Sequence, residues 1–369
     1  MRKLVLLLAA CLLGTGLAQD YVMGINFDAG GKFDRSFNEG TWNGFSSAIE
    51  GFENLDIEIL EFEGTPDTSA QGLRQMAEQG AELIVAPGFA QTDAIHAAAA
   101  EFPDTFFVNI DGGVAEPGAN ERYVTFAEHQ GSYLVGYLAG LMSQTGVVGF
   151  VGGMDIPLIQ KFDLGYQEGV LASCPDCTVI SNYVGTTPAA WNDPARAKEL
   201  ASAQQAQGAD IIYAAAGASG TGVIDFVTET MCYEDASKET PLTATASALP
   251  KSADYEAACG DGSQPLFFIG VDANQNYLGD TDGDVATLNH GLTSMLKQVD
   301  VAAANAVEAV VNGEFEGGNV VLDLAAGGVG YAVDEYNDPL IPGDVVSQLE
   351  DISAQIASGE IEVTDYTAQ

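Results

Sequence analysis

Residues 75–95 read QMAEQGAELIVAPGFAQTDAI, and residues 203–224 read AQQAQGADIIYAAAGASGTGVI. Each stretch holds the end of a helical pattern, a Gly-Ala pair, an acidic residue, an apolar run typical of a strand, a turn containing glycine, and the start of a new helix. The same helix–strand–helix unit therefore occurs twice. Two such units predict two similar α/β lobes instead of one large sheet.

Strand and helix patterns alternate in the same way along the whole chain. The apolar runs typical of buried strands lie at residues 21–27, 56–62, 82–87, 105–110, 147–152, 178–184, 210–216 and 266–271. The helical patterns between them lie at residues 68–80, 91–102, 129–144, 158–173 and 194–207. Near-continuous apolar strands that alternate with helices predict parallel sheets covered on both faces. We expect the α/β class, with two doubly wound parallel-sheet lobes.

The composition favours a globular, acidic protein. The chain has 369 residues, long enough for two domains, and 47% of them are hydrophobic, which is ample for two cores. Asp and Glu number 53 against 12 Lys and Arg, a net charge of −41. This charge argues against nucleic-acid binding, which needs basic side chains to neutralise phosphates. Because the acidic residues are scattered, we interpret them as a solvated coat suited to a salty habitat, where salt screens self-repulsion.

The first residues, MRKLVLLLAACLLGTGLAQD, predict an export signal. Arg2 and Lys3 precede an apolar run, and Gly16-Leu17-Ala18 is a small-x-small cleavage site, so we expect residues 1–18 to be removed. The alternative is a lipoprotein signal in which Cys11 carries a lipid. No other run approaches the ~20 apolar residues that span a bilayer. We therefore expect an extracytoplasmic protein, in the periplasm or at the cell surface, that is soluble or held only by lipid.

Four cysteines lie outside the leader, at 174, 177, 232 and 259. An even number in an exported protein favours disulfides. Cys174-Pro-Asp-Cys177 lies between a helix and a strand and not at a helix start, so we interpret it as a structural clip and not a redox pair. A bond between Cys232 and Cys259 would close the polar insertion at 232–265. Zinc held by the four cysteines is the alternative.

Polar and aromatic residues gather at the ends of the predicted strands. Residues 27–44, FDAGGKFDRSFNEGTWNG, form the first such turn; it has neither phosphate-binding glycine motif, and its aspartates would repel a phosphate. Similar turns follow the later strands, at 87–89, 109–111, 126–130, 191–194, 217–222 and 271–275. Single turns of this kind are often only structural. Their recurrence where parallel strands end favours a cleft that binds a flat ligand with hydroxyl groups.

No set of catalytic residues is visible. The three histidines, at 96, 129 and 290, are far apart, and Gly217-Ala218-Ser219-Gly220-Thr221 lacks the nucleophile-elbow pattern. The acidic loop at 280–284 departs from a calcium loop at its sixth and twelfth positions. We therefore expect binding without turnover, with no metal and no cofactor.

Several blocks of sequence resemble one family in both content and order. DAGGKFDRSFNEGTWNG, IVAPGF, FFVNID, FAEHQGSYLVGYLAG, NDPARAKELA, FFIGVDANQ and LTSMLKQVD are similar to blocks of the basic membrane protein family. These are the substrate-binding proteins of ABC importers that resemble the purine nucleoside receptor. The resemblance extends over roughly residues 21–312. It implies a type I periplasmic-binding-protein fold, in which two α/β lobes are joined by hinge strands and hold the ligand between them.

The resemblance also implies a ligand and its contacts. In relatives the ligand is often a purine nucleoside whose base lies between two aromatic rings, here Phe37 and Trp191; the family usually has phenylalanine at the second position. The ribose contacts correspond to Asp28, Asp272 and Lys297, with backbone contacts near Gly217. Glu128 stands where some relatives have an Asp that reads the base. The strand-end turns add Asn38, which is also a candidate helix cap, and Phe89 to the expected site.

We expect lobe I to contain residues 19–128 with about 273–318, and lobe II to contain residues 129–272 with about 319–369. An ABC permease and its ATPase are the expected partners of a monomeric binding protein. Two alternatives stay open: another flat ligand, such as a flavin, or a receptor that senses its ligand without transport. An enzyme such as a nucleoside hydrolase is the weakest reading, because no catalytic set is visible.

Overall fold

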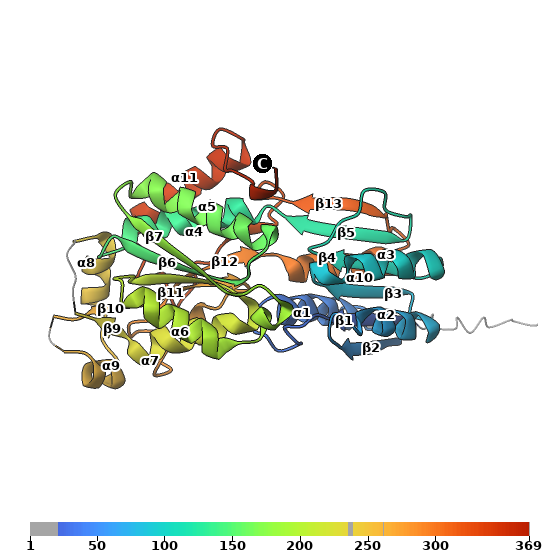
Figure 1. Ribbon diagram of the computed structural model, residues 1–369, viewed down its shortest axis with the longest axis horizontal. Helices are drawn as coiled ribbons and strands as arrows, with labels where there is room; N and C mark the ends of the chain where they lie inside the picture. The colour runs from blue at the N-terminus through green and yellow to red at the C-terminus, as the bar shows by residue number, and fades with distance from the viewer. Residues whose placement is uncertain (1–20, 235–238, 261, 369) are drawn as a thin grey trace, which may run out of the picture.

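The computed structural model describes residues 21–234, 239–260 and 262–368. The expected cleavage after Ala18 and the alternative lipidation of Cys11 lie outside the described residues. Figure 1 shows two lobes, each a sheet with helices on its faces. The α/β class and the two parallel-sheet lobes predicted from the alternating apolar runs are confirmed.

Lobe I contains a six-stranded sheet in the order β13-β5-β4-β3-β1-β2, and every pair in it is parallel. Its strands are β1 (Tyr21–Phe27), β2 (Ile57–Glu63), β3 (Leu83–Pro87), β4 (Phe106–Ile110), β5 (Glu121–Phe126) and β13 (Gly318–Leu322). Its helices are α1 (Phe37–Glu50), α2 (Ser69–Glu78), η1 (Phe89–Gln91), α3 (Thr92–Glu101) and α10 (Val299–Val311). Strand β3 is buried along its whole length, as expected for a strand covered on both faces.

Lobe II contains a second six-stranded sheet, in the order β14-β12-β11-β8-β6-β7, in which only the short β14 is antiparallel to its neighbour. Its strands are β6 (Val147–Met154), β7 (Thr178–Gly185), β8 (Ile211–Ala215), β11 (Phe267–Asp272), β12 (Gly291–Lys297) and β14 (Val329–Tyr331). Its helices are α4 (Glu128–Met142), α5 (Pro157–Ser173), η2 (Pro188–Trp191), α6 (Pro194–Gln205), η3 (Gly217–Ser219), α7 (Gly220–Thr230), η4 (Asn276–Gly279), α11 (Gly343–Ala357) and η5 (Tyr366–Ala368).

Strand pairing moves two of the expected lobe boundaries. Strand β12 pairs with β11, so residues 273–297 lie with lobe II, although we assigned them to lobe I. Strand β13 pairs with β5, so residues 318–322 lie with lobe I, and the return to lobe II comes after Leu322. The chain therefore crosses between lobes after Phe126, after Lys297 and after Leu322. These boundaries were hard to place because a strand has the same apolar pattern in either sheet.

The insertion at 232–265 folds onto lobe II, at the end of the lobe farthest from lobe I (Figure 1). It contains β9 (Cys232–Tyr233), α8 (Pro241–Ala248), α9 (Ala253–Ala258) and β10 (Gln264–Pro265), and the disulfide between Cys232 and Cys259 closes it. Leu242, Ala246 and Tyr255 join the core of the lobe. The insertion is therefore packed and not loose, and the predicted Cys232–Cys259 bond is confirmed.

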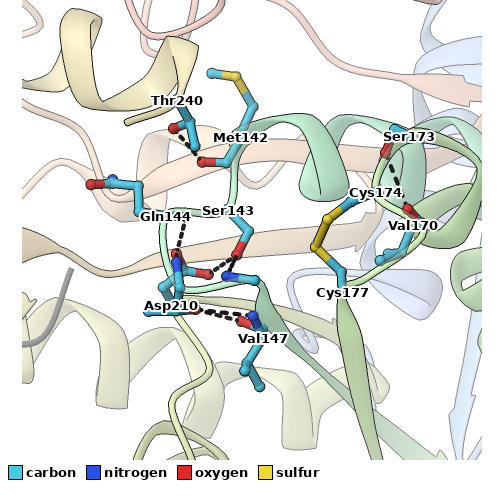
Figure 2. Close-up of a disulfide and its surroundings, with 12 residues drawn as sticks. Met142, Ser143, Gln144, Val147, Val170, Ser173, Cys174, Cys177, Asp210 and Thr240 are labelled. Atoms are coloured by element: carbon cyan, nitrogen blue, oxygen red, sulfur yellow. Dashed lines mark hydrogen bonds between the residues drawn. A yellow bond between two sulfur atoms is a disulfide. The ribbon is translucent and has the colours of Figure 1, made fainter. Parts of the chain in front are cut away.

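The second disulfide, Cys174–Cys177, joins the end of α5 to the start of β7, as the clip interpretation predicted (Figure 2). Beside it, Asp210 ties the turn after α4 to the start of β8. Its carboxylate accepts hydrogen bonds from Ser143 Oγ at 2.8 Å and from the backbone nitrogens of Gln144 and Thr145 at 2.5 and 3.0 Å. These contacts fix the far end of lobe II and leave the opposite end of the sheet for the site.

Candidate ligand-binding site

A cavity lies between the two lobes and is lined by both. The space open to the centre of a water-sized molecule is about 60 Å³, within a surrounding 550 Å³ that includes open solvent. The residues that line it are Asp28, Gly30, Asp34, Phe37, Asn38, Gly88, Phe89, Asp111, Leu158, Ile159, Phe162, Trp191, Ala215, Gly217, Val271, Asp272 and Lys297.

The topology explains why these residues meet. In lobe I the chain leaves β1 on one side toward β2 and then returns to the other side as β3, so the carboxyl ends of β1 and β3 flank a switch point. In lobe II the same reversal occurs between β6 and β8. Crevices outside strand ends at such switch points are where open α/β sheets bind ligands. Here the two crevices face each other and form one cavity.

The turn between β1 and α1 is held by Asp34 and not by the residue that we expected to cap the helix. The Asp34 carboxylate accepts hydrogen bonds from the backbone nitrogens of Ser36, Asn38 and Glu39 at 2.9, 2.9 and 3.1 Å. Asn38 lies inside the helix, so its expected role as a cap is wrong. Its Nδ2 donates to Asp28 Oδ1 at 2.7 Å and to Asp34 Oδ2 at 2.9 Å. Both oxygens of Asp34 are therefore used by the fold, whereas Asp28, which lines the cavity, uses only Oδ1 and has no hydrogen bond to Oδ2 among the described residues.

Two aspartates end equivalent strands in the two lobes. Asp111 follows β4 and Asp272 ends β11, and both have positive φ, 72° and 62°. Asp tolerates this left-handed conformation better than most residues, but such strain is concentrated at functional sites. Asp272 Oδ2 accepts a hydrogen bond from Ser36 Oγ at 2.6 Å, across the lobe boundary. Asp111 Oδ1 is buried without a partner among the described residues.

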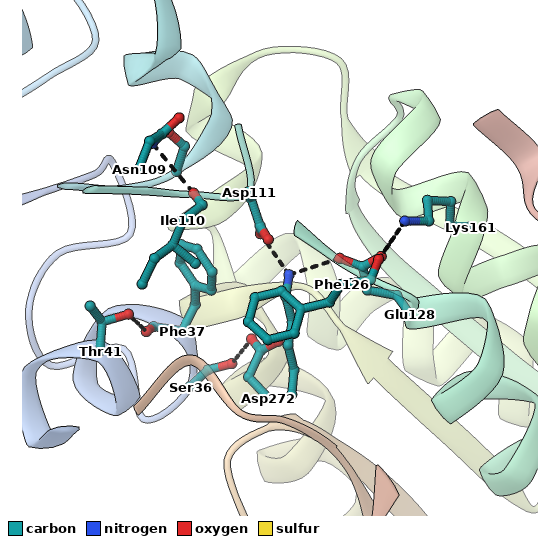
Figure 3. A network of polar contacts seen from close by, with 12 residues as sticks. Ser36, Phe37, Thr41, Asn109, Ile110, Asp111, Phe126, Glu128, Lys161 and Asp272 are labelled. Carbon is teal, nitrogen blue, oxygen red and sulfur yellow. Dashed lines mark hydrogen bonds and ion pairs between the residues drawn. The ribbon is translucent and has the colours of Figure 1, made fainter. Parts of the chain in front are cut away.

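Lys297, at the end of β12, is the centre of a buried ion-pair network. Figure 3 shows the other three members, Asp111, Glu128 and Lys161. Its Nζ lies 2.6 Å from Asp111 Oδ2 and 3.1 Å from Glu128 Oε1. Glu128 Oε2 in turn lies 2.5 Å from Lys161 Nζ. The four side chains alternate in charge and connect lobe I to lobe II at the point where the chain crosses between them.

Burial and neighbouring charges shift the pKa values of these groups in opposite directions. Burial raises the pKa of Asp111 and that of Asp272 to about 6, although Lys297 acts to lower both. Burial also raises the pKa of Asp28. For Glu128, burial acts to raise the pKa, but the two lysines outweigh it and the pKa is lowered. For Lys297, burial acts to lower the pKa, but the surrounding carboxylates raise it, so the ammonium stays charged.

Aromatic rings from both lobes complete the cavity. Phe37 and Phe89 come from lobe I, and Phe162 and Trp191 come from lobe II. The Trp191 ring lies against Gly153, where a Cβ atom would come within 2.3 Å of the ring. The larger ring therefore has room because the strand beneath it has no side chain at that position.

Eight of the nine predicted residues line the cavity: Asp28, Phe37, Asn38, Phe89, Trp191, Gly217, Asp272 and Lys297. Glu128 does not; it is fully buried behind Lys297. Whether any of them contacts a ligand stays a prediction. The nine predicted residues do not include Asp111 or Phe162, which also line the cavity. Asp111 belongs to the strand-end turn at 109–111 that the sequence singled out, and like Asp272 it comes at the end of a strand in its own lobe. Phe162 lies within α5, where no strand-end signal exists.

Two features are absent from the described residues. No group of three or more His, Cys, Asp or Glu side chains is close enough to hold a metal ion in this part of the chain. No helix in the same residues has both the length and the apolar character needed to cross a membrane.

Comparison with known sequences agrees with this architecture. The sequence profile of the family described as "ABC transporter substrate-binding protein PnrA-like" matches residues 22–367. The chain belongs to this family. The expected resemblance to the basic membrane protein family is therefore confirmed.

Proteins similar to this chain include both curated sequences and solved structures, and only some of their names state a function. The ABC transporter nucleoside-binding protein BmpA of Lactococcus lactis is 31% identical over 313 residues, which cover 83% of this chain and 80% of that protein. The CD4+ T-cell-stimulating antigen of Listeria monocytogenes is 30% identical over 359 residues, or 94% of this chain and 89% of the antigen. Among solved structures, an ABC transporter solute-binding protein of Aeropyrum pernix has a TM-score of 0.73 and 25% identity, and covers 93% of this chain and 92% of its own. The chain is thus a substrate-binding protein of the ABC-transporter type.

Proposed function

We propose that this chain, outside the cytoplasm, captures a purine nucleoside between its two lobes and delivers it to an ABC permease. The observation that carries the proposal is the combination of unpaired carboxylate oxygens and aromatic rings from both lobes in one cavity. The nucleoside-binding relative from Lactococcus lactis supports the same ligand class.

The carboxylates suit the hydroxyl groups of a ribose. Asp28 Oδ2 and Asp111 Oδ1 have no hydrogen-bond partner among the described residues, and Asp272 uses only Oδ2 for its bond to Ser36. An ionised carboxylate can only accept hydrogen bonds, so the ligand must supply donors. Vicinal hydroxyls supply two donors at a fixed spacing, which fits carboxylates that converge from both lobes.

The aromatic rings suit a flat base. Phe37 and Trp191 reach the cavity from different lobes, so closure of the lobes can bring a ring to each face of a base. Stacking would add about 0.5–1.5 kcal/mol for each ring beyond the burial of apolar area. The tryptophan provides a wider face than the phenylalanine usual in the family, and therefore also accepts larger fused rings such as a flavin.

The charge of the cavity argues against phosphorylated ligands. Lys297 is the one cationic side chain among the described residues that line the cavity, and it is already within 2.6 Å of Asp111. A phosphate would meet carboxylates without a free cation to neutralise it. We therefore expect a neutral nucleoside to bind and its monophosphate to be rejected.

The test has a binding arm and a transport arm. The mature protein, in high salt, is titrated calorimetrically with adenosine, guanosine, inosine, uridine, adenosine monophosphate, ribose and riboflavin. We expect heat from the purine nucleosides and none from the monophosphate. Equal binding of the monophosphate, or no binding of any nucleoside, would overturn the ligand assignment, and heat from riboflavin alone would reassign the site to flavins.

The transport arm uses cells with and without the gene. Uptake of labelled adenosine should fall when the gene is deleted and return when it is restored. Binding in the titration without any change in uptake would refute delivery to a permease and favour a sensing receptor.

A further inference from the structure

Glu128 and Lys161 do not line the cavity, but Glu128 contacts both Lys161 and Lys297, and Lys297 lines it. Figure 3 shows Glu128 beside Lys161. We propose that Glu128 and Lys161 are positioning residues that hold the Lys297 ammonium in place and so set the affinity of the cavity for its ligand. The affinity part of this proposal rests on the proposed function; the positioning part does not.

The location of the two residues puts them where the lobes are joined. Glu128 begins α4, immediately after the crossing at Phe126, and Lys297 ends β12, immediately before the crossing into α10. Their contact at 3.1 Å therefore links two crossing segments. Lys161 Nζ also donates a hydrogen bond to the backbone oxygen of Phe126 at 2.7 Å, which ties α5 to the same crossing.

Burial gives these contacts their strength. Glu128 is 0% exposed, Lys297 is 3% exposed and Lys161 is 7% exposed. A buried ammonium without a counter-ion is strongly unfavourable, so each lysine must keep a carboxylate partner. Both lysines share Glu128 as a partner, so every charged side chain of the network has an opposite charge beside it.

The network also keeps the ligand-binding oxygens available. With Glu128 in place, Lys297 needs only one oxygen of Asp111, and Asp111 Oδ1 stays unpaired in the buried wall. Without Glu128, Lys297 must draw on the cavity carboxylates for its second counter-ion. Acceptors that the ligand needs would then be occupied by the protein's own lysine.

Lys161 acts on Lys297 indirectly, through Glu128. It neutralises the oxygen of Glu128 that Lys297 does not use. Without Lys161, Glu128 has Lys297 as its only counter-ion, and the ammonium is drawn away from Asp111 and out of the cavity. The rings of Phe37, Phe126 and Phe162 lie 5.1–5.6 Å from the ammonium, so a shift of Lys297 also disturbs two rings of the cavity wall.

The experiment compares Glu128→Gln, Lys161→Met and the double variant with a matched control. Glu121→Gln is the control, because Glu121 is also a buried carboxylate, 2.9 Å from His96 Nδ1, but does not line the cavity. The first readout is the ¹⁵N resonance of the Lys297 side-chain ammonium in the ligand-free protein, assigned with Lys297→Met. The second readout is the dissociation constant for adenosine.

We expect each single variant to shift or broaden the Lys297 resonance and to weaken adenosine binding by about tenfold or more. The double variant should bind better than the two single effects combined predict, because it leaves no buried charge without a partner. Glu121→Gln should lower the melting temperature and change neither readout.

Two outcomes would overturn the proposal: an unchanged Lys297 resonance in both single variants, or strictly additive losses of affinity in the double variant. If the natural protein binds no nucleoside, the proposed function fails and the resonance alone decides the positioning role. If Glu128→Gln does not fold, Lys161→Met decides, since Lys161 has no place in the cavity wall and can act only through its neighbours.

Discussion

Phe37→Ala is the most direct test of the base-stacking geometry. Phe37 is the first residue of α1, and its ring lines the cavity 5.2 Å from the Lys297 ammonium. The substitution removes the ring without touching the carboxylates. The helix start should survive, because Asp34 and not Phe37 holds the backbone nitrogens of that turn.

The size of the effect follows from two contributions. Loss of the stacked ring removes about 0.5–1.5 kcal/mol. Loss of about half the apolar burial of a phenylalanine side chain removes about 1 kcal/mol more. The sum, about 1.5–2.5 kcal/mol, corresponds to adenosine binding that is roughly 10- to 60-fold weaker.

The assay is calorimetric titration with adenosine at constant salt, beside a melting curve for each variant. Phe33→Ala is the matched control, because Phe33 lies in the same turn but is 76% exposed and does not line the cavity. It should leave the dissociation constant unchanged. If Phe37→Ala binds adenosine within twofold of the natural protein, or if both variants lose the same affinity, the stacking argument is wrong.

Three further results are expected. The Asp272→Asn variant should be more stable than the natural protein at pH 7.5, because burial raises the pKa of Asp272 to about 6 and the ionised carboxylate therefore lowers the stability of the natural protein at neutral pH. The same variant should bind adenosine more weakly. The gain in stability should shrink as the pH falls through 6 toward 3.8, where the natural side chain takes up its proton, and melting curves that differ equally at all pH values would contradict it. Replacing both Cys232 and Cys259 by Ser should lower stability by about 3.5 kcal/mol for a sequence separation of 27, measured by urea unfolding, with adenosine affinity unchanged because the insertion lies far from the cavity. Added salt should raise the melting temperature over the low range and leave the dissociation constant for adenosine nearly flat; a flat or falling melting temperature would refute the halophilic interpretation.

The sequence predicts those parts of the fold that depend on apolar runs. All eight predicted strands are present, including the edge strands β2 and β7, which have no fully buried residue. Strands β5 and β12 were missed because polar residues interrupt them. Glu121 and Arg122 begin β5, and in β12 the buried hydroxyls of Thr293 and Ser294 are paired to Ala332 O and to Asn276 Oδ1. Such hydrogen bonds depend on tertiary neighbours that no local pattern shows.

Some residues of the site could likewise be predicted from the sequence, and others could not. Residues at strand ends, such as Asp28 and Asp272, could be predicted because parallel strands deliver their carboxyl ends to one edge. Glu128 was predicted as a ligand contact from the family resemblance and from its place in the strand-end turn at 126–130; in the fold its neighbours are two lysines. Lys161 lies on α5, and the pattern of buried and exposed residues in this helix does not reveal that its side chain contacts Glu128 and the backbone of Phe126.

The acidic character of the chain has two separate physical origins. The scattered carboxylates of the coat face water, where each costs little and repulsion between them is screened within about 8–10 Å at ordinary salt. The carboxylates of the cavity are buried and cannot be screened, so the fold balances them individually: three backbone nitrogens for Asp34, a serine for Asp272, and two lysines for Glu128 and Asp111. Of the 12 Lys and Arg residues in the whole chain, two, Lys161 and Lys297, are buried where the chain crosses between the lobes. Two buried lysines in a chain so poor in cations favour the role proposed above, in which Glu128 and Lys161 hold the Lys297 ammonium in place.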